Sequence, residues 1–191
     1  SCFKSIKSYP ANFPQIYIIF FSIANGSSFY WIQENCLISK RNSRSYWVKN
    51  AINVFINDWS DALLSLSDTL EVLDLSDNKL AELPESIVKL KHLKVVFFAR
   101  NNFTTFPIIL KEFSVLSMVG FKSNQIHTIP ENAFPPLLKW LILTDNKIKK
   151  IPKSIGVCHL LQKCALAGNQ IEELPDEMAS CLKLELLRIS A

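Results

Sequence analysis

The sequence predicts an α/β solenoid: a curved stack of repeats, with parallel strands on the concave face and short helical or irregular segments on the convex face. A unit of 22 or 23 residues recurs five times in the second part of the chain. Each unit keeps one asparagine and one proline at a constant spacing, and an L-x-L centre precedes the asparagine in the first and fourth units. The repeated asparagines are Asn78, Asn101, Asn124, Asn146 and Asn169.

Each part of the unit has a physical reason. The L-x-L centre alternates with period two, which predicts a short strand whose leucines point the same way. The asparagine follows the strand, where its amide can hydrogen-bond backbone groups of its own turn and of the neighbouring one. The proline stiffens the turn and starts the returning segment. Since one unit cannot bury its leucines alone, stacked units share a core and their strands pair in parallel.

The chain divides into two regions. We assign residues 58–191 to the solenoid, as a partial repeat (61–69), five full repeats and a truncated repeat that begins at Leu184. Residues 1–57 show no repeat, and we expect an irregular region that caps the open end of the solenoid or is poorly ordered. The chain starts at Ser1 and stops within a repeat, so we interpret it as a fragment of something longer.

Composition and charge favour a folded, soluble protein that does not bind nucleic acid. Hydrophobic residues make up 49% of the 191 residues and charged residues 20%, a balance that is typical of globular domains. The formal net charge of +4 lies within residues 1–60, which hold six Lys and Arg against two acidic residues. The repeat region is neutral, and a nucleic-acid binder concentrates positive charge on its folded face.

The five cysteines indicate a reducing compartment. Their number is odd and no CxxC pair occurs, which favours reduced, packed thiols and a cytoplasmic location. Cys158 and Cys181 are 23 residues apart and thus equivalent in stacked units. They either approach closely enough for a disulfide or lie as small hydrophobes in one core column.

Secretion is the alternative to a cytoplasmic location. Residues 16–24 are apolar but too few to span a bilayer, so we predict no membrane span. They resemble either the hydrophobic region of a signal peptide or a buried strand or cap segment. Asn25 and Asn102 each begin an Asn-x-Ser/Thr triplet, which marks an acceptor for N-glycosylation in secreted proteins and also arises by chance.

No motif for catalysis, a cofactor or a metal emerges from the sequence. Four glycines leave no glycine-rich phosphate cradle, and no kinase H-R-D or D-F-G element occurs. His92, His127 and His159 fall in different repeats, without metal-ligand spacing. The cluster of Lys147, Lys149, Lys150 and Lys153 attracts an acidic partner or is simply a solvated edge. We therefore predict a non-enzymatic chain without a cofactor.

The candidate binding site is the concave face. Residues that flank the inward leucines project there, and on repeats two to four they form an apolar cluster: Val95, Phe97, Met118, Trp140 and Ile142. Charged residues are predicted to rim this cluster: Asp74, Asp77, Arg100, Lys122, Asp145 and Lys163. An apolar core with a polar rim is how protein interfaces are built, so we predict a protein partner of unknown identity. The alternative is that residues 1–57 or a further domain covers this face.

The unit L-x-x-L-x-L-x-x-N-x-L-x-x-L-P-x-x-I resembles the leucine-rich repeat, and its LPxxI form resembles intracellular members of that class. Segments such as "TLEVLDLSDN" and "LKWLILTDN" are similar to the repeat segment of leucine-rich repeat proteins linked to a protein kinase domain. The resemblance implies a protein–protein interaction module in intracellular signalling. It also leaves two alternatives: the regulatory or substrate-recruiting arm of a serine/threonine protein kinase whose catalytic domain lies outside this chain, and a secreted or cell-surface receptor fragment.

Overall fold

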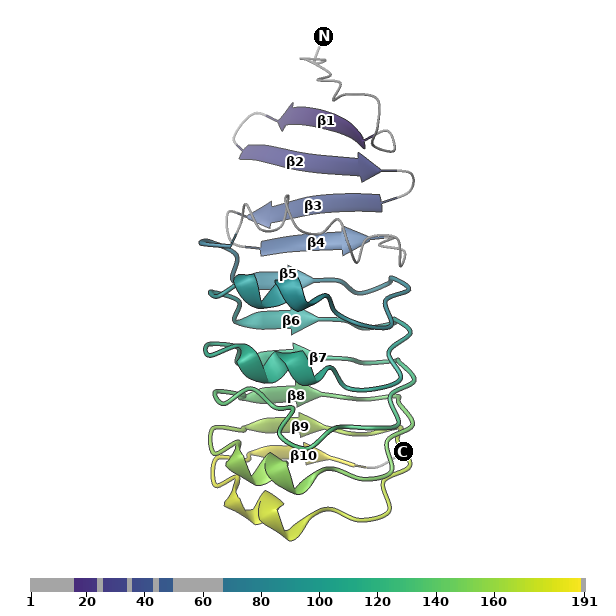
Figure 1. Ribbon diagram of the computed structural model, residues 1–191, viewed down its shortest axis with the longest axis vertical. Coiled ribbons are helices and arrows are strands. Elements are labelled where there is room, and N and C mark those ends of the chain that lie inside the picture. The colour runs from purple at the N-terminus through teal and green to yellow at the C-terminus, as the bar shows by residue number, and fades with distance from the viewer. Residues whose placement is uncertain (1–15, 24–25, 34–35, 43–44, 50–66, 190–191) are drawn as a thin grey trace.

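The structure is a computed structural model that describes residues 16–23, 26–33, 36–42, 45–49 and 67–189, with side chains described over 67–189 only. Within these ranges the strands form one sheet of ten, and their order in the sheet is their order in the sequence (Figure 1). Because each strand pairs with the next one along the chain, the molecule is an elongated stack.

The six C-terminal strands come from the repeats and are three residues long. They are β5 (Val72–Asp74), β6 (Val95–Phe97), β7 (Met118–Gly120), β8 (Trp140–Ile142), β9 (Lys163–Ala165) and β10 (Leu186–Arg188). All five neighbouring pairs are parallel, and each aligns one repeat with the next without a shift. The predicted parallel solenoid is confirmed.

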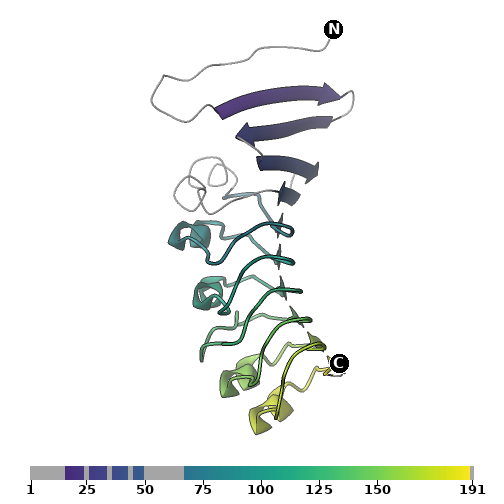
Figure 2. The same ribbon diagram turned by 90° about the vertical axis from the view of Figure 1, so that its right-hand side faces the viewer.

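The returning segments lie on the side of the stack opposite the strands (Figure 2). Four of them form one short 3₁₀ helix each: η2 (Glu85–Lys89), η3 (Ile108–Glu112), η4 (Lys153–Val157) and η5 (Asp176–Ser180). Each helix directly follows the proline of its repeat, as expected for a residue with a fixed φ and no N–H. The helices spread more widely along the stack than the strands, so the strand face is the concave one (Figure 2).

The third repeat differs from the others on the helix side. Between Pro130 and Leu138, all of which the structure describes, no helix is recorded. This repeat is one residue shorter and carries Pro135 and Pro136 where the other repeats end their helix. Proline donates no backbone hydrogen bond, and it disfavours a helical conformation in the residue before it. The segment therefore crosses the convex side as turns.

The core fills the space between the strands and the returning segments. Leu73, Val96 and Leu141 are fully buried and represent one layer that runs through the repeats. In repeats two and three, phenylalanines replace the leucines and pack on one another. The ring of Phe121 stacks on Phe98 at a centroid distance of 4.7 Å. Aromatic packing of this kind adds to the hydrophobic stabilisation that every repeat shares with its neighbours.

Four further strands extend the sheet at its N-terminal end: β1 (Ile16–Ile23), β2 (Gly26–Gln33), β3 (Cys36–Asn42) and β4 (Ser45–Lys49). They pair antiparallel with one another, and β4 pairs parallel with β5. The sequence analysis expects an irregular region over residues 1–57, with a buried strand as one alternative for residues 16–24, and the structure records strands in these four segments. These four strands are rich in aromatic and β-branched residues but have no repeated spacing, so a comparison of repeats does not detect them. A capping role for this region remains a prediction.

None of the helices in the described ranges has the length and apolar character that crossing a membrane requires.

Candidate interaction surface

Side chains on the strand face stand in two straight columns, because the parallel register aligns every repeat. One column is Val72, Val95, Met118, Trp140, Lys163 and Leu186. The other is Asp74, Phe97, Gly120, Ile142, Ala165 and Arg188. Neighbouring strands are about 4.8 Å apart, so side chains in one column contact each other across the repeats.

The apolar cluster of the strand face consists of Val95, Phe97, Met118, Trp140 and Ile142. Each of these residues is half-buried, whereas the residues between them in the strands, such as Val96 and Leu141, are fully buried. The structure therefore brings all five predicted cluster residues to one surface, on three adjacent strands. Half-buried apolar side chains of this kind can bury further area against a partner, which is favourable at about 25 cal/mol per Å².

Gly120 shapes the middle of the apolar cluster. A Cβ atom at Gly120 would lie 2.8 Å from Cδ1 of Phe97, a distance that real Cβ contacts do not show. The ring of Phe97 therefore leans over the neighbouring repeat and occupies the place of its missing side chain. The sequence analysis did not single out this glycine, although a glycine inside a strand signals a close approach by another group.

Trp140 carries a cation on its ring. Nζ of Lys163, the next residue in the same column, lies 4.1 Å from the ring centroid. Such a contact contributes about 0.5–1 kcal/mol at an exposed site. It also fixes a positive charge beside the largest apolar side chain of the surface.

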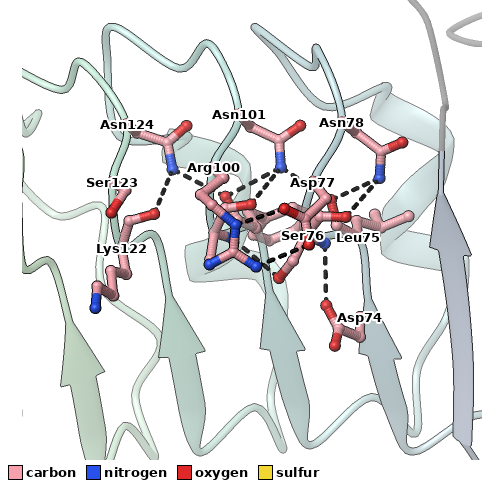
Figure 3. A network of polar contacts seen from close by, with 12 residues as sticks. Asp74, Leu75, Ser76, Asp77, Asn78, Arg100, Asn101, Lys122, Ser123 and Asn124 are labelled. Carbon is pink, nitrogen blue, oxygen red and sulfur yellow. Dashed lines mark hydrogen bonds and ion pairs between the residues drawn. The ribbon is translucent and has the colours of Figure 1, made fainter.

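Charged side chains of the predicted rim lie where the strands end (Figure 3). Nη2 of Arg100 donates to Oδ2 of Asp77 at 2.7 Å, and Nε of Arg100 donates to the other carboxylate oxygen. This hydrogen bond, together with the charge of Asp77, raises the pKa of Arg100 above its ordinary value. Both side chains are exposed, so we expect little stabilisation from the pair.

The remaining rim residues also have partners or solvent contact. Nζ of Lys122 lies 4.0 Å from Oδ2 of Asp145, which in turn accepts a hydrogen bond from Oγ of Ser123 at 3.3 Å. Oδ1 of Asp74 accepts a hydrogen bond from the backbone N–H of Ser76. The structure thus places the predicted rim residues around the apolar cluster, although Asp77, Arg100 and Asp145 lie in the turns that follow the strands.

Behind this surface the repeated asparagines from Asn101 onwards connect neighbouring repeats. Asn101 is typical: its Nδ2 donates to the carbonyl of Phe98 in its own turn at 3.1 Å and to that of Leu75 in the preceding repeat at 2.9 Å. Its Oδ1 accepts from the N–H of Leu80. Asn124, Asn146 and Asn169 repeat this arrangement, and Asn78 donates within its own turn. The ladder fixes the spacing of the repeats, and hence the columns of the strand face.

The residue before each repeated asparagine has a left-handed backbone. The φ angles are 62° at Asp77, 53° at Arg100, 56° at Ser123, 57° at Asp145 and 70° at Gly168. This conformation is strained for residues other than glycine, and aspartate tolerates it better than most. It turns the chain sharply at the end of the strand and presents the preceding side chains at the edge of the strand face. Gly168 is the one glycine among these five residues, and it alone is of a type that favours this conformation.

The three cysteines that the structure describes, Cys158, Cys164 and Cys181, are buried and free. Burial raises the pKa of the Cys158 and Cys164 thiols to about 12, and it also raises the pKa of Cys181. Buried thiols that resist ionisation are poor nucleophiles and poor metal ligands. They occupy core positions, so the packed-thiol interpretation describes them, whereas Cys2 and Cys36 lie outside the residues whose side chains are described.

The other sequence candidates do not gather into a chemical site. Over residues 67–189, no group of three or more His, Cys, Asp or Glu side chains could hold a metal ion. In the lysine cluster, Lys150 and Lys153 pair with Glu173 and Glu177. Asn102 is exposed, whereas Asn25 is outside the described residues.

The strand face, the helices behind it and the asparagine ladder together define an α/β solenoid of the leucine-rich repeat type. The Leucine Rich Repeat family matches residues 69–90 of the chain. The repeat region therefore has the fold of leucine-rich repeat proteins, and this fold supports a protein-interaction module.

Comparison with known proteins agrees with this class. Adenylate cyclase of Schizosaccharomyces pombe is 30% identical over 125 residues, which cover 64% of this chain and 7% of the cyclase. Leucine-rich repeat serine/threonine-protein kinase 1 of Mus musculus is 29% identical over 126 residues, which cover 63% of this chain and 6% of the kinase. The chain thus spans less than a tenth of the length of these two relatives.

Among solved structures, the complex of TLR13 with ssRNA13 superposes with a TM-score of 0.61 at 28% identity. The match covers 69% of this chain and 19% of the TLR13 chain. The similarity therefore concerns the repeat array.

Proposed function

We propose that this chain binds a protein partner on its strand face and acts as an interaction module in intracellular signalling. The observation that carries the proposal is the apolar cluster of the strand face. Five half-buried apolar side chains on three adjacent strands are framed by charged residues, which is the anatomy of a protein interface. Trp140 and Phe97 are the anchors, because large aromatic residues dominate binding energy at such sites. The module is proposed to be cytoplasmic and of the LPxxI type.

Substitution of Trp140 by alanine tests this proposal. The full chain, carrying an affinity tag, captures proteins from a cell extract, and each purified candidate is then titrated against wild type and variant. We expect Trp140→Ala to weaken binding about tenfold or more. Its melting temperature changes little, since Trp140 is only half-buried.

The matched control is Val157→Ala. Val157 is an apolar residue of η4 and is 55% exposed on the side opposite the strands. This variant should bind like wild type. If Trp140→Ala unfolds the chain, Trp140 is a core residue; if it binds like Val157→Ala, the strand face is not the interface.

A second candidate function is the regulatory or substrate-recruiting arm of a serine/threonine protein kinase. It is favoured by the similarity to a leucine-rich repeat serine/threonine kinase. Sequencing of the transcript on both sides of this segment tests it. An H-R-D and a D-F-G motif in the same reading frame would support the kinase arm, whereas a complete reading frame without them would exclude it.

A further inference from the structure

The cations of the strand face are paired with acidic residues at one end of the stack and not at the other. At its N-terminal end, the cations Lys94 and Arg100 pair with Glu71 and Asp77. At its C-terminal end, Lys139, Lys163 and Arg188 form no ion pair with any residue in the described ranges. Glu185, which directly precedes β10 and is exposed, also has no ion pair with a described residue, so the three cations leave a net excess of positive charge at this end of the stack.

Two of these three cations neighbour the largest anchor of the apolar cluster, and the third lies two strands further along the stack. Lys139 directly precedes Trp140 and is exposed, and Lys163 follows Trp140 in the same column. Arg188 is exposed in β10, in the column that contains Ile142. A partner that packs an apolar side chain on Trp140 would therefore bring its neighbouring residues within reach of two or three unpaired cations.

We propose that the partner is an acidic peptide segment in which an apolar anchor is flanked by aspartate or glutamate. The inference rests on the proposed function and specifies its partner. The anchor packs against Trp140 and Ile142, while the flanking carboxylates bind the three cations. A basic segment would be repelled, because the Trp140 ring already carries the Lys163 ammonium.

An acidic peptide fits this surface better than a nucleic acid does. Asp74 and Asp77 lie where β5 ends (Figure 3), and Asp145 holds the turn position after β8 that is equivalent to that of Asp77. A phosphate backbone with one charge per nucleotide would pass close to these carboxylates, and like charges across an interface are costly. A peptide can place its few carboxylates at the cations alone.

Selection from a random peptide library tests the inference. The full chain selects twelve-residue peptides, and the most enriched sequence is synthesised and titrated. We expect enrichment of Asp and Glu beside an aromatic or aliphatic residue, and binding that weakens as salt is raised. The variant Lys139→Glu/Lys163→Glu/Arg188→Glu should lose about tenfold or more in affinity for this peptide, and should regain it when the acidic residues of the peptide are changed to lysine.

A second triple variant, Lys89→Glu/Lys91→Glu/Lys183→Glu, is the matched control. It changes the net charge equally at exposed positions outside the strands, and none of its three lysines forms an ion pair within residues 67–189. It should bind the peptide like wild type. If both triple variants lose the same affinity for the peptide, the loss is due to net charge alone and the inference is overturned. The salt dependence of the wild type gives an independent readout should a variant fail to fold.

The same selection separates this inference from the proposed function. Peptides that need Trp140 but carry no acidic residues would overturn the acidic partner and leave the binding surface intact. Peptides that bind Trp140→Ala as well as wild type would overturn both. A single-stranded RNA of mixed sequence is the third probe. If this RNA displaces the selected peptide, the inference of an acidic peptide partner is overturned in favour of a nucleic acid.

Discussion

Asn146 joins two repeats through contacts at both ends of its amide. Its Nδ2 donates to the carbonyls of Leu143 and Phe121 at 3.0 and 2.9 Å, and its Oδ1 accepts from the N–H of Ile126 at 3.0 Å. Leucine at this buried position would leave these backbone groups without partners. We expect Asn146→Leu to lower the free energy of unfolding by about 1–3 kcal/mol, measured by urea denaturation.

The control for Asn146→Leu is Asn102→Leu. Asn102 adjoins a ladder asparagine but is exposed, and only its backbone N–H is engaged, with the carbonyl of Leu80. This change should cost little. Equal unfolding free energies for Asn146→Leu and wild type would show that the ladder does not hold the repeats together.

The buried thiols give a prediction on reactivity and alkaline stability. The pKa of Cys158 and Cys164 is raised to about 12 in the folded chain, against 9.0 for an unperturbed thiol. Between these values the unfolded chain loses protons and the folded chain keeps them. Their contribution to stability is therefore complete below about pH 9 and is lost as the pH rises towards about 12.

Alkylation with iodoacetamide, resolved by mass spectrometry, measures this protection. At pH 8 we expect Cys158 and Cys164 to react far more slowly in the native chain than in urea. The alkaline branch is followed as a falling melting temperature above about pH 9. Rapid modification of Cys158 under native conditions would mean that the C-terminal repeats open readily or that the thiol is not buried.

At the scale of elements, the third repeat stabilises the helix that follows it. Glu131 of this helix-free segment accepts hydrogen bonds from the backbone N–H groups of Lys153 and Ser154, at the start of η4. The hydrogen bond from the Ser154 side chain, followed by that from its backbone, lowers the pKa of Glu131 below its ordinary value. A carboxylate that caps a helix from the neighbouring repeat thus couples two units.

We expect Glu131→Gln to lower the melting temperature modestly at neutral pH. Since the folded pKa of Glu131 is depressed, its contribution is present above the ordinary carboxyl pKa and is lost as the pH falls through the lowered value. The difference between wild type and variant should therefore shrink in acid. Glu172→Gln, an equal charge change at an exposed position without an ion pair in the described residues, is the control. A difference that persists unchanged in acid would contradict the cap.

The elements differ in how far the sequence predicts them. The six repeat strands follow from the periodic leucines, since a shared core leaves one register for all of them. Of the strands β1–β4, the sequence analysis offers a strand only for residues 16–24, although Asn25-Gly26 between two apolar runs is a hairpin signal. The third repeat's missing helix could have been read from Pro135-Pro136. The left-handed turns could not be predicted, because four of the five residues that adopt them are Asp, Arg or Ser, which do not signal a positive φ as Gly168 does.

At the scale of the whole molecule, stacking converts the repeat of the sequence into aligned columns of side chains on the concave strand face. The columns of the strand face could be predicted from sequence, because alignment of the asparagines also aligns the strands. The contacts within the columns could not be predicted. The contact of Lys163 with the Trp140 ring and that of Phe97 with Gly120 depend on side-chain rotamers, which the repeat pattern does not determine.

Site-specific photo-crosslinking tests the central claim, that the partner lies on the strand face. The photoreactive residue p-benzoylphenylalanine replaces Phe97 in the apolar cluster or, as the control, Ile108, which is 48% exposed in η3 on the opposite side. A partner identified with the wild-type chain is mixed with each variant and irradiated. The account predicts a covalent adduct from position 97 and none from position 108. An adduct from position 108 alone would place the partner on the helix side and contradict it.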